Sequence, residues 1–194
     1  MKMTVFFLVI MVFALPEQRV FTGEKEKDVV VIETEFGNIV MELEETDAPL
    51  HSANFKKLVR DGFYDSTTFH RVVPNFVIQG GDPLSKNDFP GDEGRGGPGY
   101  TIPAEIGLPH LRGAVGAARQ GDAVNPEKAS NGSQFYICLQ AQPYLDRLGY
   151  TIFGKIVEGM EVVDLIAQQP LRGERPQKDI RMKRVYMVRW KPTE

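Results

Sequence analysis

The chain has 194 residues, of which 42% are hydrophobic and 25% are charged, with 19 glycines and 13 prolines. This composition is typical of one globular domain rich in turns, and it excludes a disordered or fibrous chain. The formal net charge is −3 and acidic and basic residues are interleaved, so we expect no nucleic-acid partner.

The N-terminal residues differ in composition from the rest of the chain. Lys2 precedes an apolar run from Val5 to Leu15. The run is shorter than the roughly 20 apolar residues of a membrane-spanning helix, and it has the length and flanks of a secretory signal peptide. No A-x-A cleavage pattern follows Ala14, which leaves an uncleaved membrane anchor as the alternative to an exported, periplasmic or secreted protein. The expected division is signal peptide or anchor at residues 1–22, linker at 23–28 and folded domain at 29–192.

Two strands open the predicted domain, with a turn around Gly37 between them. Residues 29–34 place alternate side chains on two faces, and residues 39–43 alternate apolar side chains with Glu42. A period of two with one apolar face is typical of half-buried strands.

A helix is predicted over residues 46–62. Thr46 or Asp47 is the expected N-cap, because a short polar side chain can accept hydrogen bonds from the first free N–H groups. Pro49 suits the first turn, where its missing N–H does no harm, and Gly62 ends the helix.

The next stretch, FHRVVPNFVIQGGD, indicates two apolar strands around a Pro74-Asn75 corner. Arg71 is a permanent cation among neighbours that favour burial. Either its guanidinium neutralises a carboxylate from elsewhere in the chain, or it is kept for a ligand.

A long loop rich in Gly and Pro at residues 80–99 separates this stretch from the second half. Three short strand-like runs follow: RGAVGAAR, SQFYICLQ and YTIFGKIV. GMEVVDLIAQQ predicts a second helix with Val162, Leu165 and Ile166 on one face, and DIRMKRVYMVRW predicts a final strand. Many short strands without βαβ alternation favour an antiparallel sheet that closes on itself.

The residues of common catalytic devices do not occur at the required spacings. His51, His70 and His110 lack a second metal ligand at a suitable distance along the chain, and no P-loop, dinucleotide fingerprint or G-x-S-x-G motif is present. Cys138 is alone in an apolar run, where a small buried hydrophobe is the expected role. We therefore expect no metal and no cofactor, and chemistry that needs little acid or base catalysis.

Four blocks resemble the cyclophilin family of peptidyl-prolyl cis-trans isomerases: FHRVVPNFVIQGGDP, GRGGPGY, NGSQFYICL and YTIFGKIVEGMEVVD. They occur in the family's order, and the resemblance covers about residues 29–190. It implies a mainly β fold, a closed eight-stranded antiparallel barrel capped by two α-helices, with the active site on the outer surface. It also implies a cofactor-free isomerase that acts on X-Pro bonds of unfolded or extended chains and assists protein folding.

The chemistry of X-Pro isomerisation suits such a site. Rotation faces a barrier of about 18–20 kcal/mol because the C–N bond has double-bond character. Twisting localises a lone pair on the prolyl nitrogen, so a fixed donor aimed there stabilises the transition state. Arg71 matches the family's catalytic arginine, and an arginine is always charged and planar.

Further roles follow from the resemblance, one position at a time. The implied catalytic residues are Arg71, Phe76 and Gln79. The implied substrate-binding residues are Val77, Ala118, Arg119, Gln120, Gln134, Tyr136, Tyr144, Leu145 and Tyr150. Arg119 stands where many members have asparagine, and Tyr136 where they have phenylalanine. Tyr144 replaces a tryptophan and Tyr150 a histidine of the best-known members, so we expect weakened cyclosporin binding.

Two other functions remain open at this point. The first is a proline-peptide binding or chaperone module with little turnover, and the second is a carrier with a small ligand inside the barrel. Independently of these functions, the alternative interpretation of the apolar candidates Phe76, Val77, Tyr136 and Leu145 is that they are ordinary core residues. Proline-containing chains are the expected partners, and nothing in the sequence demands more than a monomer.

Overall fold

The computed structural model describes residues 26–87 and 91–191. The predicted signal peptide or anchor lies outside the described residues, as does the first half of the predicted linker. The first strand begins at Lys27, so the last two residues of that linker belong to the sheet. Lys27 lies opposite Trp190, and its ammonium contacts Glu42 at 2.7 Å. In the described part of the chain, no helix is long and apolar enough to cross a bilayer.

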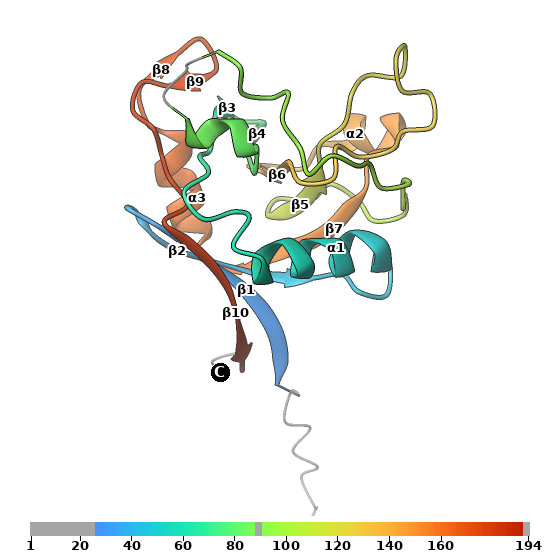
Figure 1. Cartoon of the computed structure of the whole chain (residues 1–194), viewed down its shortest axis with the longest axis horizontal. Coiled ribbons are helices and arrows are strands. Elements are labelled where there is room, and N and C mark those ends of the chain that lie inside the picture. The colour runs from blue at the N-terminus through green and yellow to red at the C-terminus, as the bar shows by residue number, and fades with distance from the viewer. Residues whose placement is uncertain (1–25, 88–90, 192–194) are drawn as a thin grey trace, which may run out of the picture.

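One antiparallel sheet of eight strands forms the body of the molecule (Figure 1). Its order is β10-β1-β2-β7-β5-β6-β4-β3. The strands are β1 (Lys27–Thr34), β2 (Gly37–Leu43), β3 (Arg71–Val73), β4 (Val77–Gly80), β5 (Ala114–Ala117), β6 (Phe135–Cys138), β7 (Ile152–Glu158) and β10 (Arg184–Trp190). A separate two-stranded hairpin consists of β8 (Leu171–Arg172) and β9 (Arg175–Pro176).

Closure of the large sheet into a barrel stays a prediction. Its outermost strands are β10 and β3, and hydrogen bonds join the segments that precede each of them. The N–H of Phe69 donates to the carbonyl of Ile180 at 2.9 Å, and the N–H of Met182 donates to that of Thr67 at 2.8 Å.

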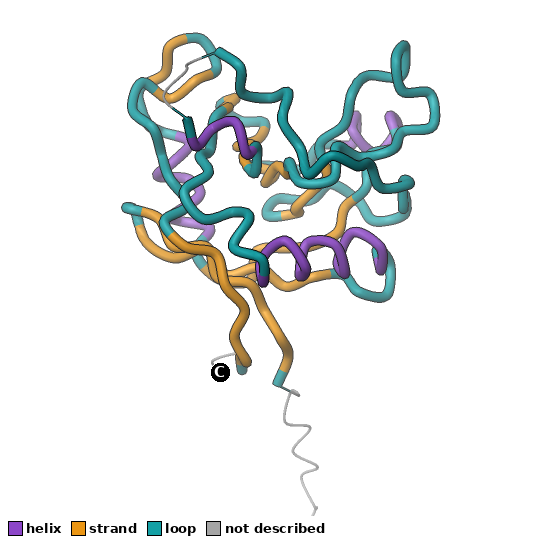
Figure 2. The backbone as a smooth tube through the Cα atoms, viewed as in Figure 1, coloured by secondary structure: helices purple, strands orange, loops and turns teal. Residues whose placement is uncertain are grey.

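Among the described residues, three α-helices accompany the sheet, one more than predicted: α1 (Pro49–Arg60), α2 (Pro143–Leu148) and α3 (Met160–Ala167). A 3₁₀ turn, η1 (Pro83–Lys86), also begins the long loop that was expected to lack regular structure. The periodicity of the sequence does not reveal α2, because six residues are too few for a repeating apolar face. Long connections that are neither helix nor strand cover the upper part of the molecule (Figure 2).

The start of α1 differs from the prediction. The N-cap is Ala48, which has no capping side chain, and neither Thr46 nor Asp47 fills that role. The carboxylate of Glu105 accepts hydrogen bonds from the N–H groups of Leu50 at 2.9 Å and His51 at 3.0 Å. A residue distant in sequence thus satisfies the free helix N–H groups, which a local pattern cannot predict.

The core lies between the sheet and the helices α1 and α3. Fully buried side chains such as Ile32, Ile78 and Ile137 fill the core against the inner face of the sheet. A carrier would need space for a small ligand there, so this packing argues against that function. In α3 the buried residues are Val162, Val163 and Ile166, whereas Leu165, predicted on the buried face, is 45% exposed.

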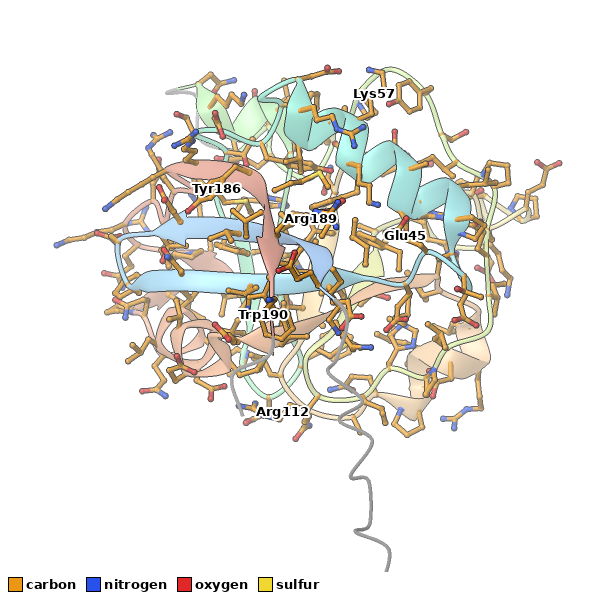
Figure 3. The ribbon with its side chains drawn as sticks, turned by 90° about the horizontal axis from the view of Figure 1, so that it is seen from below. Glu45, Lys57, Arg112, Tyr186, Arg189 and Trp190 are labelled. Carbon is orange, nitrogen blue, oxygen red and sulfur yellow. The ribbon has the colours of Figure 1, made fainter. Side chains whose placement is uncertain are left out.

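A smaller apolar cluster covers the outer face of β1. Val29 and Val31 pack there with Val40 against Tyr186 and Trp190 of β10. The last two side chains are labelled along β10 in Figure 3. Both faces of the first strand are therefore buried, as its continuous apolar run indicates.

Candidate active site

A groove of about 220 Å³ opens on the outer side of the sheet, where β3, β4 and β6 meet the connections around β5 and α2. Its lining residues are Arg71, Phe76, Val77, Gln79, Ala118, Arg119, Tyr136, Leu145 and Tyr150. All nine are among the residues that the family resemblance selected. Sequence positions almost 80 residues apart, from Arg71 to Tyr150, therefore share one surface.

The β3–β4 hairpin positions Arg71 in the groove. Asn75 has a φ of 60°, and the N–H of Phe76 donates to the carbonyl of Val73 at 3.0 Å, which makes a tight corner. Arg71 and Gln79 then lie directly opposite each other across the two strands. Nη1–H of Arg71 donates to Oε1 of Gln79 at 3.2 Å, so the strand register itself pairs them.

A carboxylate holds the other side of the guanidinium. Nε–H of Arg71 donates to Oε2 of Glu174 at 2.6 Å. Glu174 lies in the turn of the β8–β9 hairpin, and its carbonyl accepts the N–H of Val72 at 2.7 Å. The pairing with a carboxylate from elsewhere in the chain is thus observed, and a role for Arg71 in binding a ligand stays a prediction. Sequence reasoning missed Glu174, since two-residue strands leave no readable pattern.

A directional chain of amides continues from Arg71. Nε2–H of Gln79 donates to Oε1 of Gln134 at 3.0 Å, and Nε2–H of Gln134 donates to Oδ2 of Asp82 at 3.1 Å. The same Asp82 oxygen also accepts the N–H groups of Gly94 at 2.6 Å and Gly96 at 3.0 Å. Nε2–H of Gln134 also donates to the carbonyl of Gly96 at 2.8 Å, and a carbonyl only accepts, so Gln134 must turn its NH₂ toward Gly96 and Asp82 and its oxygen toward Gln79. The oxygen of Gln79 then faces Arg71, and Asp82 is a second site-supporting residue that sequence reasoning missed.

The apolar wall contains one polar group, the Tyr136 hydroxyl, which is 2.8 Å from Nε2 of His110. Nδ1 of His110 is 2.6 Å from Oδ1 of Asp146. Burial lowers the pKa of the His110 imidazole and raises that of the Tyr136 phenol well above its ordinary value, so both are neutral near pH 7. Nδ1–H therefore donates to Asp146, and Nε2 accepts the phenolic hydrogen. The backbone of Gly116 lies against the Tyr136 ring, where a Cβ atom would come within 2.2 Å of Cζ.

Arg119 closes one end of the groove. Its side chain is 2% exposed and contacts Oδ1 of Asp122 at 2.6 Å and the carbonyl of Leu148 at 2.7 Å. The guanidinium lies 4.2 Å from the centre of the Tyr150 ring, a cation–π contact. The asparagine-to-arginine departure therefore builds part of the wall.

Three predicted binding residues do not line the groove. Gln134 lies behind it and holds Gln79, and Gln120 is exposed at the end of the segment that follows Ala118. Tyr144 is 60% exposed and packs near the guanidinium of Arg147. A role for these side chains in substrate contact stays a prediction.

Comparison with known proteins identifies the family of the chain. Residues 29–187 match the family model described as cyclophilin type peptidyl-prolyl cis-trans isomerase. The chain belongs to this family. A peptidyl-prolyl cis-trans isomerase of Synechococcus elongatus is 46% identical over 126 residues, which cover 64% of this chain and 77% of that protein. Peptidyl-prolyl cis-trans isomerase B of Bacillus subtilis is 46% identical over 131 residues, covering 66% and 82%.

Solved cyclophilins share the fold. The crystal structure of a cyclophilin-type isomerase from Cryptosporidium parvum superposes with a TM-score of 0.73 at 30% identity, covering 84% of this chain and 98% of that one. A second crystal structure of that protein, in the presence of the dipeptide Ala-Pro, gives a TM-score of 0.72. This cyclophilin is thus a mainly β enzyme that isomerises X-Pro peptide bonds.

Cys138 has no part in this chemistry. It is fully buried, and burial raises the pKa of its thiol to about 12, so the nucleophilic thiolate is absent near pH 7. The prediction of a small buried hydrophobe at this position is confirmed.

Proposed function

We propose that the groove around Arg71 is the active site and that Arg71 accelerates isomerisation by donating a hydrogen bond to the prolyl nitrogen of the twisted peptide. The observation that supports this role is the orientation of the guanidinium. Nε and Nη1 are held by Glu174 and Gln79, whereas Nη2 donates to no acceptor within the described residues. One end of a fixed cation is thus left for a ligand in the groove.

The surroundings of Arg71 suit a proline ring. Phe76, Val77, Leu145 and the Tyr136 ring supply an apolar wall beside the cation. An apolar wall holds the ring of the substrate and excludes water, and exclusion of water strengthens the hydrogen bond to the developing lone pair. The donor is fixed before the substrate arrives, so little reorganisation accompanies the twist.

The substrate is an extended segment of an unfolded chain. Ala118 and Arg119 line the groove, and the main chain at Arg119 can align with a substrate backbone. The dipeptide used with the Cryptosporidium parvum relative, Ala-Pro, has the X-Pro chemistry expected here. Uncatalysed X-Pro isomerisation takes roughly tens to hundreds of seconds, so an enzyme of this kind speeds a slow folding step.

A protease-coupled isomerisation assay with Arg71→Ala tests the role of the cation. We expect kcat/KM to fall by about 10²–10³-fold, the cost of removing one preorganised transition-state donor. Arg181→Ala is the matched control, because Arg181 is also a half-exposed arginine paired with a carboxylate, Asp179, and it does not line the groove. The control is expected to keep the wild-type rate.

A different result would contradict the proposed role of Arg71. If wild type and Arg71→Ala isomerise the peptide equally slowly while both bind it, the groove is a recognition site with little turnover. Thermal unfolding of both variants must stay close to wild type for either conclusion.

A further inference from the structure

We propose that Glu174 is a positioning residue for isomerisation, whose carboxylate fixes the Arg71 guanidinium so that its free Nη2 end faces the substrate. The inference rests on the proposed role of Arg71. Glu174 does not line the groove, so it acts through the arginine and not on the peptide.

The first support is the geometry of two contacts on one planar group. Oε2 of Glu174 is 2.6 Å from Nε, and Oε1 of Gln79 is 3.2 Å from Nη1. A single contact leaves a guanidinium free to swing about the bonds of its long side chain, whereas contacts at two of its nitrogens define the plane. The Glu174 contact is the shorter one and involves a full charge.

The second support is that Glu174 is itself held in place. Its carbonyl is bonded to the N–H of Val72, the residue after Arg71, so the carboxylate and the cation are attached to neighbouring backbone. The preceding Gly173 has a φ of 64°, which allows the tight turn between β8 and β9. An anchored acceptor holds the cation more firmly than a free surface side chain would.

The third support is that the Arg71–Glu174 ion pair has little effect on folding stability. The side chains of Arg71 and Glu174 are 35% and 57% exposed, and exposed ion pairs contribute little to folding stability. Loss of Glu174 should therefore appear in turnover and not in thermal unfolding. A carboxylate also weakens a neighbouring cation as a donor, so a purely electrostatic role would have the opposite sign, and its removal would raise kcat.

The test uses Glu174→Ala and Glu174→Gln in the full chain, with kcat and KM measured separately on an X-Pro peptide. We expect Glu174→Ala to lower kcat by about 10-fold with KM within about 2-fold of wild type, because misorientation of a reacting group costs rate. Glu174→Gln keeps a carbonyl acceptor for Nε–H, so its kcat is expected to stay within about 3-fold of wild type. Arg175→Ala is the matched control, because it loosens the same hairpin without removing an acceptor from Arg71.

Nuclear magnetic resonance of the Arg71 Nε–H gives a readout besides activity. We expect a resolved, exchange-protected signal in wild type and Glu174→Gln, and its loss in Glu174→Ala. An unchanged or raised kcat in Glu174→Ala would overturn the proposal, as would an Arg175→Ala variant that is equally slow. If Arg71→Ala is as fast as wild type, the proposed role of Arg71 fails; if only Arg71→Ala is slow, the role of Glu174 alone fails.

Discussion

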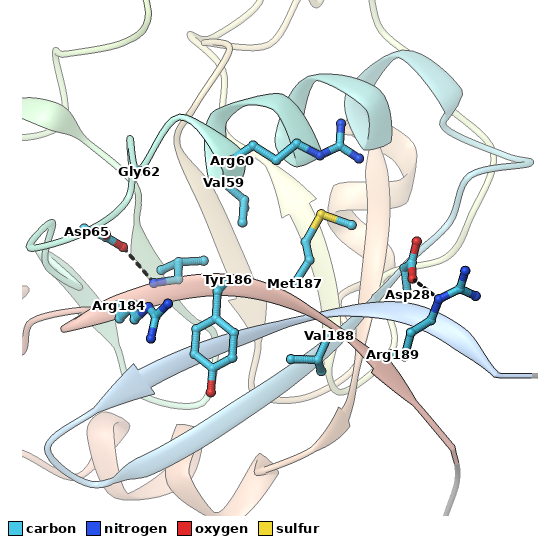
Figure 4. A pocket seen from close by; sticks show the side chains of 11 residues that line it. Asp28, Val59, Arg60, Gly62, Asp65, Arg184, Tyr186, Met187, Val188 and Arg189 are labelled. Carbon is cyan, nitrogen blue, oxygen red and sulfur yellow. Dashed lines mark hydrogen bonds and ion pairs between the residues drawn. The ribbon is translucent and has the colours of Figure 1, made fainter.

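The hollow between α1 and β10, shown in Figure 4, has a volume of about 560 Å³, whereas the groove around Arg71 has about 220 Å³. Both contain arginines and apolar side chains. In the larger hollow, Arg60 extends from α1, and Arg189 pairs with Asp28 at 3.2 Å where both are exposed. In the smaller groove, the arginine is held by two acceptors on different elements.

The larger hollow is therefore not the better candidate site. The volume of a pocket measures only the space that side chains leave unfilled. Where a helix crosses a strand at the surface, such space forms without any groups placed for catalysis. A catalytic groove needs groups fixed in advance, with each polar atom committed to a partner except the one aimed at the substrate. The Arg71 guanidinium shows that arrangement, because Glu174 and Gln79 hold Nε and Nη1 and leave Nη2 for a ligand.

After Arg71→Ala, the largest effect is expected from a larger residue at Gly116, whose backbone lies against the Tyr136 ring. In Gly116→Ala, the new Cβ would lie 2.2 Å from Cζ and 2.4 Å from Oη of Tyr136. The ring must then move into the groove and give up its bond to His110. We expect kcat/KM to fall by about 10-fold or more and the unfolding free energy to fall by about 1–3 kcal/mol, typical of overpacking. Gly107→Ala is the control, since nothing lies within 4 Å of its new Cβ, and chemical denaturation with peptide kinetics compares the two.

The next largest expected effect is the dependence of folding stability on pH. Burial lowers the folded-state pKa of His51 and His110 below 6.5, despite the favourable carboxylates of Glu105 and Asp146. The unfolded chain then binds more protons than the folded one between the lowered pKa and 6.5. Stability is therefore complete above that range and decreases as the pH falls through it.

Thermal unfolding at pH 7.5 and pH 5 measures this effect. We expect a lower midpoint at pH 5, by about 2–4 °C for each kcal/mol lost. His110→Gln should reduce the pH-dependent part, because Nε2 of His110 no longer has to stay neutral between Tyr136 and Asp146. An equal pH dependence in wild type and the variant would contradict the assignment to His110.

Changes in the larger hollow are expected to have the smallest effect. Arg60→Ala and Asp28→Asn alter its lining without touching the groove. We expect isomerisation rates within about 2-fold of wild type and unfolding free energies within about 1 kcal/mol, since exposed ion pairs contribute little. A large loss of activity in Arg60→Ala would overturn the contrast between the two hollows.

The eight strands of the large sheet, the two longer helices and most of the groove could be predicted from the amino-acid sequence alone. Alternation places Val30 and Ile32 inward, and the block around Arg71 identifies Phe76 and Gln79 as its companions. These inferences hold because strand and helix periods are local properties, and because the hairpin register makes Arg71 and Gln79 neighbours.

The groups that support the site, by contrast, are brought together by tertiary contacts. Glu174 reaches Arg71 from 103 positions along the chain, Glu105 caps α1 from 55 positions away, and Asp82 sets the direction of two amides. No periodic pattern marks these residues, since each is a single polar side chain in a loop or turn. Their roles depend on where the backbone brings them, because an ion pair or hydrogen bond requires contact within a few ångströms, whatever the separation in sequence.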